Sequence, residues 1–211
     1  MKRITAIAGS LALFAACETA TPPAPAVTSF SAAMCTDGPS IAGATSLTPE
    51  EPTGQIQHTL EVGAEAPCMR DSSGASTPYA VFALPTTGKP ASVVAGGVIE
   101  TLRLFAPAVS TLGADGKVVR TFKESDFRQR GHALAVLFTP RAEEKYVVIA
   151  AAPSRIGGAH SLVTVDPATA KPPAYVKTEQ EVAAFRASLA RPFSYAGQVF
   201  ARVYFADPDP K

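Results

Sequence analysis

The stretch GQVFARVYF at residues 197–205 has the clearest strand pattern in the chain and decides the fold class. Successive side chains of a strand point to opposite faces, so every second residue shares a face. One face of this stretch is apolar and carries Val199, Ala201, Val203 and Phe205. The other face carries Phe200, Arg202 and Tyr204. This alternation predicts a half-buried antiparallel strand whose apolar face packs against a core.

Other stretches upstream have the same β-branched or aromatic character, and turn signals such as TGKP at 87–90 and ADGK at 114–117 separate them. They span residues 55–62, 79–84, 93–105, 109–112, 117–122, 133–138, 145–151 and 161–165. Residues 146–151 are continuously apolar, as expected for a central strand. We therefore expect a mainly β protein with a single β-sandwich domain, jelly-roll-like, at residues 34–211.

One short helix is expected in the C-terminal half. Thr178 and Glu181 have the spacing of a capping box, in which each side chain bonds an otherwise unpaired backbone N–H. Apolar residues then recur at intervals of three and four, namely Val182, Phe185 and Leu189. This stripe predicts packing against the sheet. The helix should end before Pro192, because proline disfavours helical geometry in the residue that precedes it.

The N-terminus has the order of a secretory signal peptide. Lys2 and Arg3 precede an apolar run at residues 4–16, which ends at Cys17. Signal peptides have apolar runs of roughly 7–15 residues, whereas a membrane-spanning helix needs roughly 20. The small residues before Cys17 resemble a bacterial lipoprotein signal, in which the cysteine is lipidated and becomes the mature N-terminus. The alternative is an ordinary signal peptide cut near residue 15 or 16, which leaves Cys17 as a free thiol.

Residues 17–33 follow as the lipidated cysteine and a segment rich in Ala, Thr, Pro and Ser. This composition cannot bury a core and predicts a disordered tether. In lipoproteins of Gram-negative bacteria, an aspartate after the cysteine favours the inner membrane, whereas this chain has Glu18. We therefore expect a cell-envelope protein held by a lipid on Cys17, in the outer membrane and facing the periplasm.

Cys35 and Cys68 are the remaining cysteines, 33 residues apart. Export would place them in an oxidising compartment, where such a pair forms a disulfide. Metal binding is the alternative, but two isolated cysteines without CxxC spacing or a nearby histidine make a poor zinc site. The sequence thus indicates no metal and no cofactor.

The charge balance gives no support for a nucleic-acid partner. The 211-residue chain carries a formal charge of +1, and removal of Lys2 and Arg3 with the signal peptide changes it to about −1. Binding to nucleic acid depends mainly on neutralising phosphates with Lys and Arg, and a near-neutral protein lacks that excess.

The sequence contains no convincing catalytic set. His160 and Ser161 adjoin, but neighbouring residues on a strand point to opposite faces, so His160 is poorly placed to activate Ser161. His58 and His132 stand alone, and the pair at residues 143–144 is expected to be solvated in a polar turn. No GxSxG, HExxH or phosphate-loop motif occurs in the chain after Cys17. We expect a protein that is not an enzyme, with a hydrolase as the minor alternative.

Two groups of residues are candidates for binding. The basic stretch at 120–130 offers a partner surface made of Arg120, Lys123, Arg128 and Arg130, although its aromatics can also turn inward. Tyr175 and Tyr195 lie near expected loops and are candidate ligand contacts. Carbohydrate sites combine aromatic faces with hydrogen-bonding groups, and this chain has no Trp and five Tyr.

The middle of the chain resembles the maltose-operon periplasmic protein family (MalM-like). The resemblance covers residues 78–205 and is carried by YAVFALP at 79–85, ETLRLFAPAVSTL at 100–112 with GADGK after it, EKYVVI at 144–149 and YAGQVFARV at 195–203. It implies an exported, non-enzymatic envelope protein, an accessory or interaction protein in maltodextrin uptake whose partner is another envelope protein or a glycan. The alternative is a glycan- or small-molecule-binding module of the periplasm.

Overall fold

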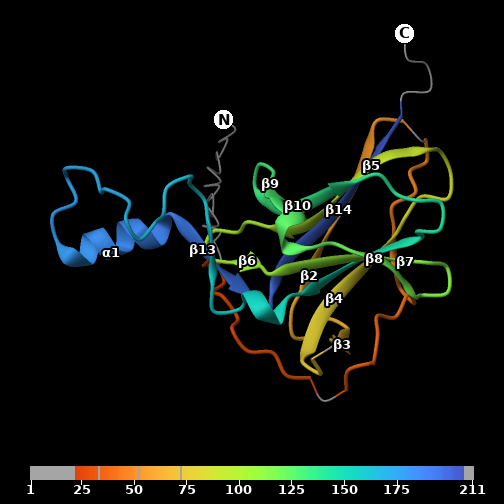
Figure 1. Ribbon diagram of the computed structural model, residues 1–211, viewed down its shortest axis with the longest axis horizontal. Coiled ribbons are helices and arrows are strands. Elements are labelled where there is room, and N and C mark those ends of the chain that lie inside the picture. The colour runs from red at the N-terminus through yellow and green to blue at the C-terminus, as the bar shows by residue number, and fades with distance from the viewer. Residues whose placement is uncertain (1–21, 33, 52, 72, 207–211) are drawn as a thin grey trace, which may run out of the picture.

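The computed structural model describes residues 22–32, 34–51, 53–71 and 73–206. The expected signal peptide at residues 1–16 and Cys17 lie outside these residues. Two sheets face each other and form a β-sandwich, with a helical arm at one end (Figure 1). The expected mainly β fold with one short helix is thus confirmed.

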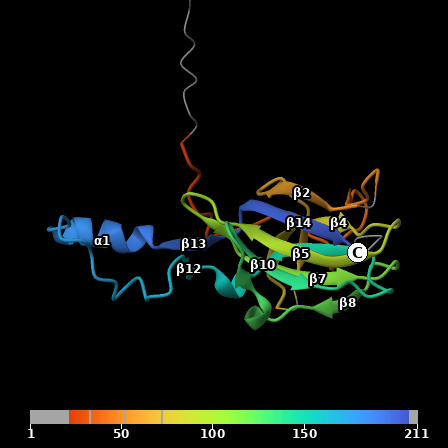
Figure 2. The same ribbon diagram turned by 90° about the horizontal axis from the view of Figure 1, so that it is seen from above.

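The first sheet has six strands. Its order is β1 (Thr45–Ser46), β4 (Ser76–Ala83), β11 (Tyr146–Ala151), β7 (Pro107–Leu112) and β8 (Val118–Thr121), with β3 (Cys68–Arg70) paired to β4. The second sheet has the order β2 (Gln55–Val62), β14 (Gly197–Phe205), β5 (Pro90–Val98), β10 (Ala133–Phe138) and β9 (Arg128–Gln129). In Figure 2 the second sheet is seen towards its face, with β2, β14 and β5 side by side in this order. The continuously apolar β11 is central in its sheet, as predicted.

The strand order is that of a jelly roll. The main strands in chain order are β2, β4, β5, β7, β8, β10, β11 and β14, and all neighbours among them are antiparallel. Numbered one to eight, they run one-eight-three-six in one sheet and two-seven-four-five in the other. This arrangement interleaves strands from both ends of the chain in each sheet, which is the jelly-roll topology.

The core lies between the two sheets. Its fully buried side chains include Phe82 and Ile149 from one sheet and Val93 and Val203 from the other. Burial of one such side chain stabilises the fold by about 1.5–3 kcal/mol relative to leaving it in water. Every second residue of β14 contributes to this core, so the alternation in the sequence sets the inner face of its sheet.

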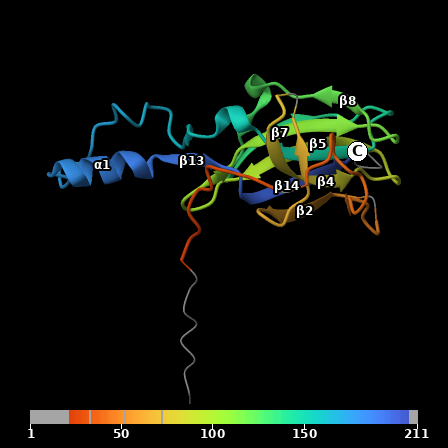
Figure 3. The ribbon, with the colours of Figure 1, turned by 90° about the horizontal axis from the view of Figure 1, so that it is seen from below.

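The helix α1 (Glu179–Ser188) begins at the predicted capping box. Glu181 N–H donates to Thr178 Oγ1 at 3.2 Å, and Thr178 N–H donates to Glu181 Oε2 at 2.9 Å. The expected packing of its apolar stripe on the sheet is wrong, because none of its residues is buried. The helix lies in the connection between β12 (Ala159–Ser161) and β13 (Ala190–Ser194), which extends beyond the sandwich (Figure 3). We call residues 162–189 the arm.

Two expected strands differ from the observed ones in more than the position of their ends. The stretch 93–105 is interrupted after β5, where Glu100 N–H donates to Arg103 O at 2.9 Å and closes a turn before β6 (Leu104–Phe105). Arg103 is buried there in ion pairs with Glu61 and Glu100, which hold the turn. The stretch 161–165 ends as a strand at Ser161, whose hydroxyl donates to Val163 O at 2.7 Å in a bend. β6 and β12 both pair with β13 in a small third sheet.

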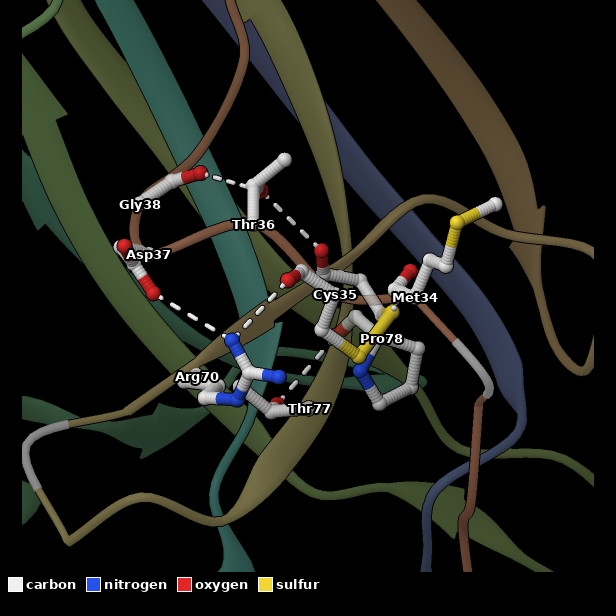
Figure 4. Close-up of a disulfide and its surroundings, with 9 residues drawn as sticks. Met34, Cys35, Thr36, Asp37, Gly38, Arg70, Thr77 and Pro78 are labelled. Carbon is white, nitrogen blue, oxygen red and sulfur yellow. Dashed lines mark hydrogen bonds and ion pairs between the residues drawn. A yellow bond between two sulfur atoms is a disulfide. The ribbon is translucent and has the colours of Figure 1, made fainter.

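Cys35 and Cys68 form the predicted disulfide (Figure 4). It ties the N-terminal segment to β3, and backbone hydrogen bonds from Thr36 N to Cys68 O (3.1 Å) and from Arg70 N to Thr36 O (2.8 Å) extend that contact. Arg70 also donates to Asp37 and to the Cys35 carbonyl, both at 3.3 Å. Closing a loop of this length removes chain entropy equivalent to about 3–4 kcal/mol.

Candidate functional site

The outer faces of the two sheets differ in how they are covered. On the six-stranded sheet, Tyr79 and Val148 are buried beneath Ile41 and Ala44 of the N-terminal segment. Ser40 N–H donates to the Tyr79 hydroxyl at 2.8 Å and fixes that segment in place. The N-terminal segment therefore covers the β4–β11 part of this outer face.

The outer face of the five-stranded sheet carries a groove of about 990 Å³, which we call the sheet groove. Its walls come from β2, β14, β5 and β10 and from the β9–β10 turn at residues 130–132. Strand alternation explains its lining, since Phe200, Arg202 and Tyr204 form the outer face of β14 and their neighbours on β5 are Gly96, Val94 and Ser92.

Small residues keep the floor of the groove low. Ala133, Ala135 and Phe200 form an apolar layer with Val94 and Val98 at its edge. Gly96 lies in the same layer, and a Cβ at this position would overlap the Leu134 carbonyl oxygen and the backbone of Ala135. The close approach of β5 and β10 therefore requires glycine there.

One end of the groove is a polar cluster built around Arg202. Its Nε donates to Gln57 Oε1 at 2.6 Å and its Nη1 donates to the Tyr204 hydroxyl at 3.0 Å. The guanidinium carbon also lies 5.9 Å from the centre of the Tyr204 ring. Two neutral partners thus fix the orientation of this cation on the groove surface.

The other end is the β9–β10 turn, which displays Arg130 and His132 to solvent. Gly131 adopts a positive φ of 59° in this turn. The turn is braced by Gln129, whose Oε1 lies 3.2 Å from His160 Nε2 and whose amide donates to Gly131 O at 3.4 Å. Burial, and secondarily the charge of Arg155, lowers the pKa of His160 below its ordinary value. The neutral imidazole is therefore the favoured form in the contact with Gln129.

The predicted partner surface does not form one uniform basic patch. Arg120 pairs with Glu144 at 2.8 Å and packs on the rings of Phe122 and Phe138 at 4.7 and 4.8 Å. Lys123, Arg128 and Arg130 are exposed, and Arg128 donates to the backbone carbonyls of residues 125 and 127. Of the four, only Arg130 lines the sheet groove.

The two predicted tyrosine contacts also lie apart from the sheet groove. Tyr175 is 77% exposed on the arm. Tyr195 is half-buried, with the Phe30 ring 6.0 Å from its own. Tyr204 lines the groove instead. Its alternation with core residues in β14 is the signal that places it on the outer face.

The residues considered for the minor alternative, a hydrolase, form no hydrogen bonds with one another in the described part of the chain. His160 contacts Gln129, whereas Ser161 donates to Val163 O. His58 is exposed on β2, and His132 is exposed in the β9–β10 turn. Glu144, expected in a solvated turn, is buried and is the exception to that prediction, while Glu143 beside it is exposed.

The described part of the chain holds no group of three or more His, Cys, Asp or Glu side chains that could bind a metal ion. None of its helices is both long and apolar enough to cross a membrane. Comparison with known protein families, with curated proteins and with solved structures finds no match to this chain.

Proposed function

We propose that this protein is a non-enzymatic binding module of the bacterial cell envelope, which holds a glycan in the sheet groove. The observation that carries the proposal is the contrast between the two outer faces: the N-terminal segment packs over the β4–β11 part of one, and the other has an open groove lined with fixed polar groups. Sites for small molecules combine an apolar floor with a few placed polar groups.

The lining of the groove suits a sugar. Sugars present hydroxyls at their edges and apolar C–H faces, so they need hydrogen-bonding groups beside an apolar or aromatic surface. Arg202, Gln57 and His132 supply hydrogen-bonding groups, and Tyr204 supplies an aromatic ring with a polar tip.

The location of the protein belongs to the same proposal. A lipid on Cys17 anchors the sandwich to the outer membrane on its periplasmic side, and the protein acts as an accessory component of glycan uptake, of the maltose-operon periplasmic protein type. This resemblance makes maltodextrins the first glycans to test. A protein partner in the envelope, docking at Lys123, Arg128 and Arg130, is the competing role, since these three side chains are exposed.

A thermal-shift experiment tests glycan binding. The full chain is heated with a panel of neutral and acidic glycans, and a ligand at about 100 times its Kd adds about 2.7 kcal/mol, which shifts the Tm by on the order of 5–10 °C. Tyr204→Ala should abolish the shift, whereas the matched variant Tyr175→Ala on the arm should retain it.

The Tm of each variant without ligand shows whether it is folded. A panel without any shift would contradict glycan binding and direct the search to protein partners. A shift lost in Tyr175→Ala and retained in Tyr204→Ala would place the site on the arm rather than in the sheet groove.

A further inference from the structure

The charges that face the sheet groove are all positive. Arg130 and Arg202 line it, and within the described part of the chain no Asp or Glu does. The protein as a whole is close to neutral, so this excess is a property of the groove and not of the composition. A local cluster of one sign raises the concentration of ligands of the opposite sign.

The partners of Arg202 leave its charge uncompensated. Gln57 and Tyr204 accept its hydrogen bonds, and these partners are an amide and a phenol rather than carboxylates. A guanidinium has five N–H groups, so these two bonds leave donors available to a ligand. Because its orientation is already fixed, little conformational entropy is lost when a carboxylate binds.

The nearest carboxylate on this face of β2 is engaged elsewhere. Glu61 lies four residues from Gln57 along the strand, about 13 Å at the usual rise per residue, and pairs with Arg103 at 2.7 Å. Glu100 pairs with the same arginine. Neither carboxylate neutralises Arg202, so its charge is available to a ligand that carries a negative charge.

The two cations lie at opposite ends of the groove. Arg202 is in register with Val94 on β5, while the Arg130 N–H donates to Ala133 O, and Ala133 is in register with Val98. Val94 and Val98 are four residues apart, again about 13 Å. A ligand that reaches both cations is therefore extended and has repeated negative groups, unlike a single small anion.

An acidic peptide fits this surface less well than a polysaccharide. Peptides commonly bind a sheet by adding a strand to an unpaired edge. The strands under the groove floor, β14 and β5, are each paired on both sides, so they offer no backbone partners to a peptide. The groove offers side-chain amide, hydroxyl, imidazole and guanidinium groups, which suit hydroxyls and carboxylates.

We propose that the sheet groove binds an acidic polysaccharide, with Arg202 and Arg130 contacting carboxylates on separate sugar units. This inference rests on the proposed function, because it names the class of glycan held at the same site.

The test uses the full chain and titrates three acidic oligosaccharides by calorimetry: oligogalacturonate, oligomers of alginate and oligomers of hyaluronan. Fully methyl-esterified oligogalacturonate is the matched neutral ligand, since it keeps the sugar backbone and loses the charge. We expect at least one acidic oligomer to bind, and its affinity to fall as NaCl is raised from about 20 mM to about 500 mM. If oligogalacturonate is that ligand, its ester should bind about tenfold or more weakly.

Charge-removing variants locate the effect. Arg202→Gln and Arg130→Gln should each weaken binding of the acidic oligomer about tenfold, which corresponds to about 1.4 kcal/mol. The control Lys145→Gln removes an exposed cation next to β11 in the other sheet and should leave the affinity unchanged. An equal loss in Lys145→Gln would show non-specific attraction and overturn the proposal.

The remaining outcomes separate the two proposals. One outcome is that neutral glycans bind, that Tyr204→Ala abolishes this binding, and that no acidic oligomer binds more tightly. This outcome would overturn the acidic-polysaccharide inference and leave the proposal of glycan binding intact. Absence of binding by all acidic and neutral glycans would overturn both.

Discussion

The Glu144 carboxylate joins β7 and β8 of the six-stranded sheet to the connection that leads into β11. Its side chain is fully buried and accepts hydrogen bonds from the Thr111 hydroxyl, the Arg120 guanidinium and the Arg141 backbone N–H, each at 2.8 Å. The Arg120 side chain is 22% exposed, so the ion pair is shielded from solvent. A buried charge of this kind is tolerated because all its partners are in place.

Replacing Glu144 should therefore destabilise the protein more than the small change in side-chain shape alone would. In Glu144→Gln the amide keeps the size but leaves Arg120 without its counter-ion, and we expect the free energy of unfolding to fall by about 2–4 kcal/mol. Urea denaturation measures the loss. Glu143→Gln, the matched change one residue away, is exposed and should stay within about 0.5 kcal/mol of the wild type. Equal effects of the two changes would contradict this account.

At the scale of single residues, the sequence alone does not distinguish the buried Glu144 from the exposed Glu143 beside it. Glu143 and Glu144 are neighbours with the same chemistry, and what distinguishes them is that Thr111 and Arg120, 33 and 24 positions away, bond Glu144. The polar cluster of the sheet groove could not be predicted for the same reason, because Gln57, which accepts from Arg202, lies 145 positions away from it in the sequence. The environment of a polar side chain thus depends on hydrogen-bond partners from strands that are distant in the sequence, and local patterns do not reveal these partners.

At the scale of elements, the sequence predicts the bounds of a strand or helix correctly where residues within that element determine them. The strands 55–62, 133–138 and 197–205 have the bounds expected from alternation and turn signals, and α1 starts at its capping box. The break after β5 was missed because the turn depends on Arg103 reaching Glu61 on β2. The packing of the apolar stripe of α1 was predicted wrongly, because an apolar helix face indicates that the helix packs but not which element it packs against.

The position of α1 predicts that its stability is independent of the sandwich. Thr178→Ala removes the N-cap bond, which typically costs about 1 kcal/mol, so amides of α1 should exchange with deuterium about fivefold faster. The Tm of the sandwich should not change, because no residue of the helix is buried. Thr178→Ser keeps a capping hydroxyl and should restore slow exchange. A Tm that falls together with the protection would mean that the arm unfolds with the sheets.

At the scale of the whole molecule, the sequence predicts a jelly-roll-like sandwich, but the order of the strands within each sheet could not be derived from strand patterns. Alternation fixes which face of a strand is apolar, yet it does not specify which strand lies beside it. β14 pairs with β2 and β5, and β11 pairs with β4 and β7, so each sheet joins distant parts of the chain. The sheet groove depends on these pairings, and it was therefore beyond reach from the sequence.

The described N-terminal segment limits how far the sandwich can lie from a lipid anchor. Val27 N–H donates to the buried Ser194 hydroxyl at 2.9 Å, and Tyr195 N–H donates to Val27 O at 2.8 Å. Ten residue steps separate Cys17 from Val27, which span at most about 35 Å when fully extended. A lipid on Cys17 would thus hold the sandwich close to the membrane surface.

Replacing the cysteine tests that arrangement in cells. With lipid on its thiol and new N-terminus, the wild-type protein should be recovered in the membrane fraction and incorporate labelled fatty acid. Cys17→Ser should lose the label and leave the outer membrane. The double variant Cys35→Ser/Cys68→Ser removes the disulfide and should keep both label and membrane location, because the anchor does not depend on it. A wild-type protein that is soluble in the periplasm, with a Cys17 thiol open to alkylation, would instead support the ordinary signal peptide. The sheet groove would then belong to a freely diffusing protein.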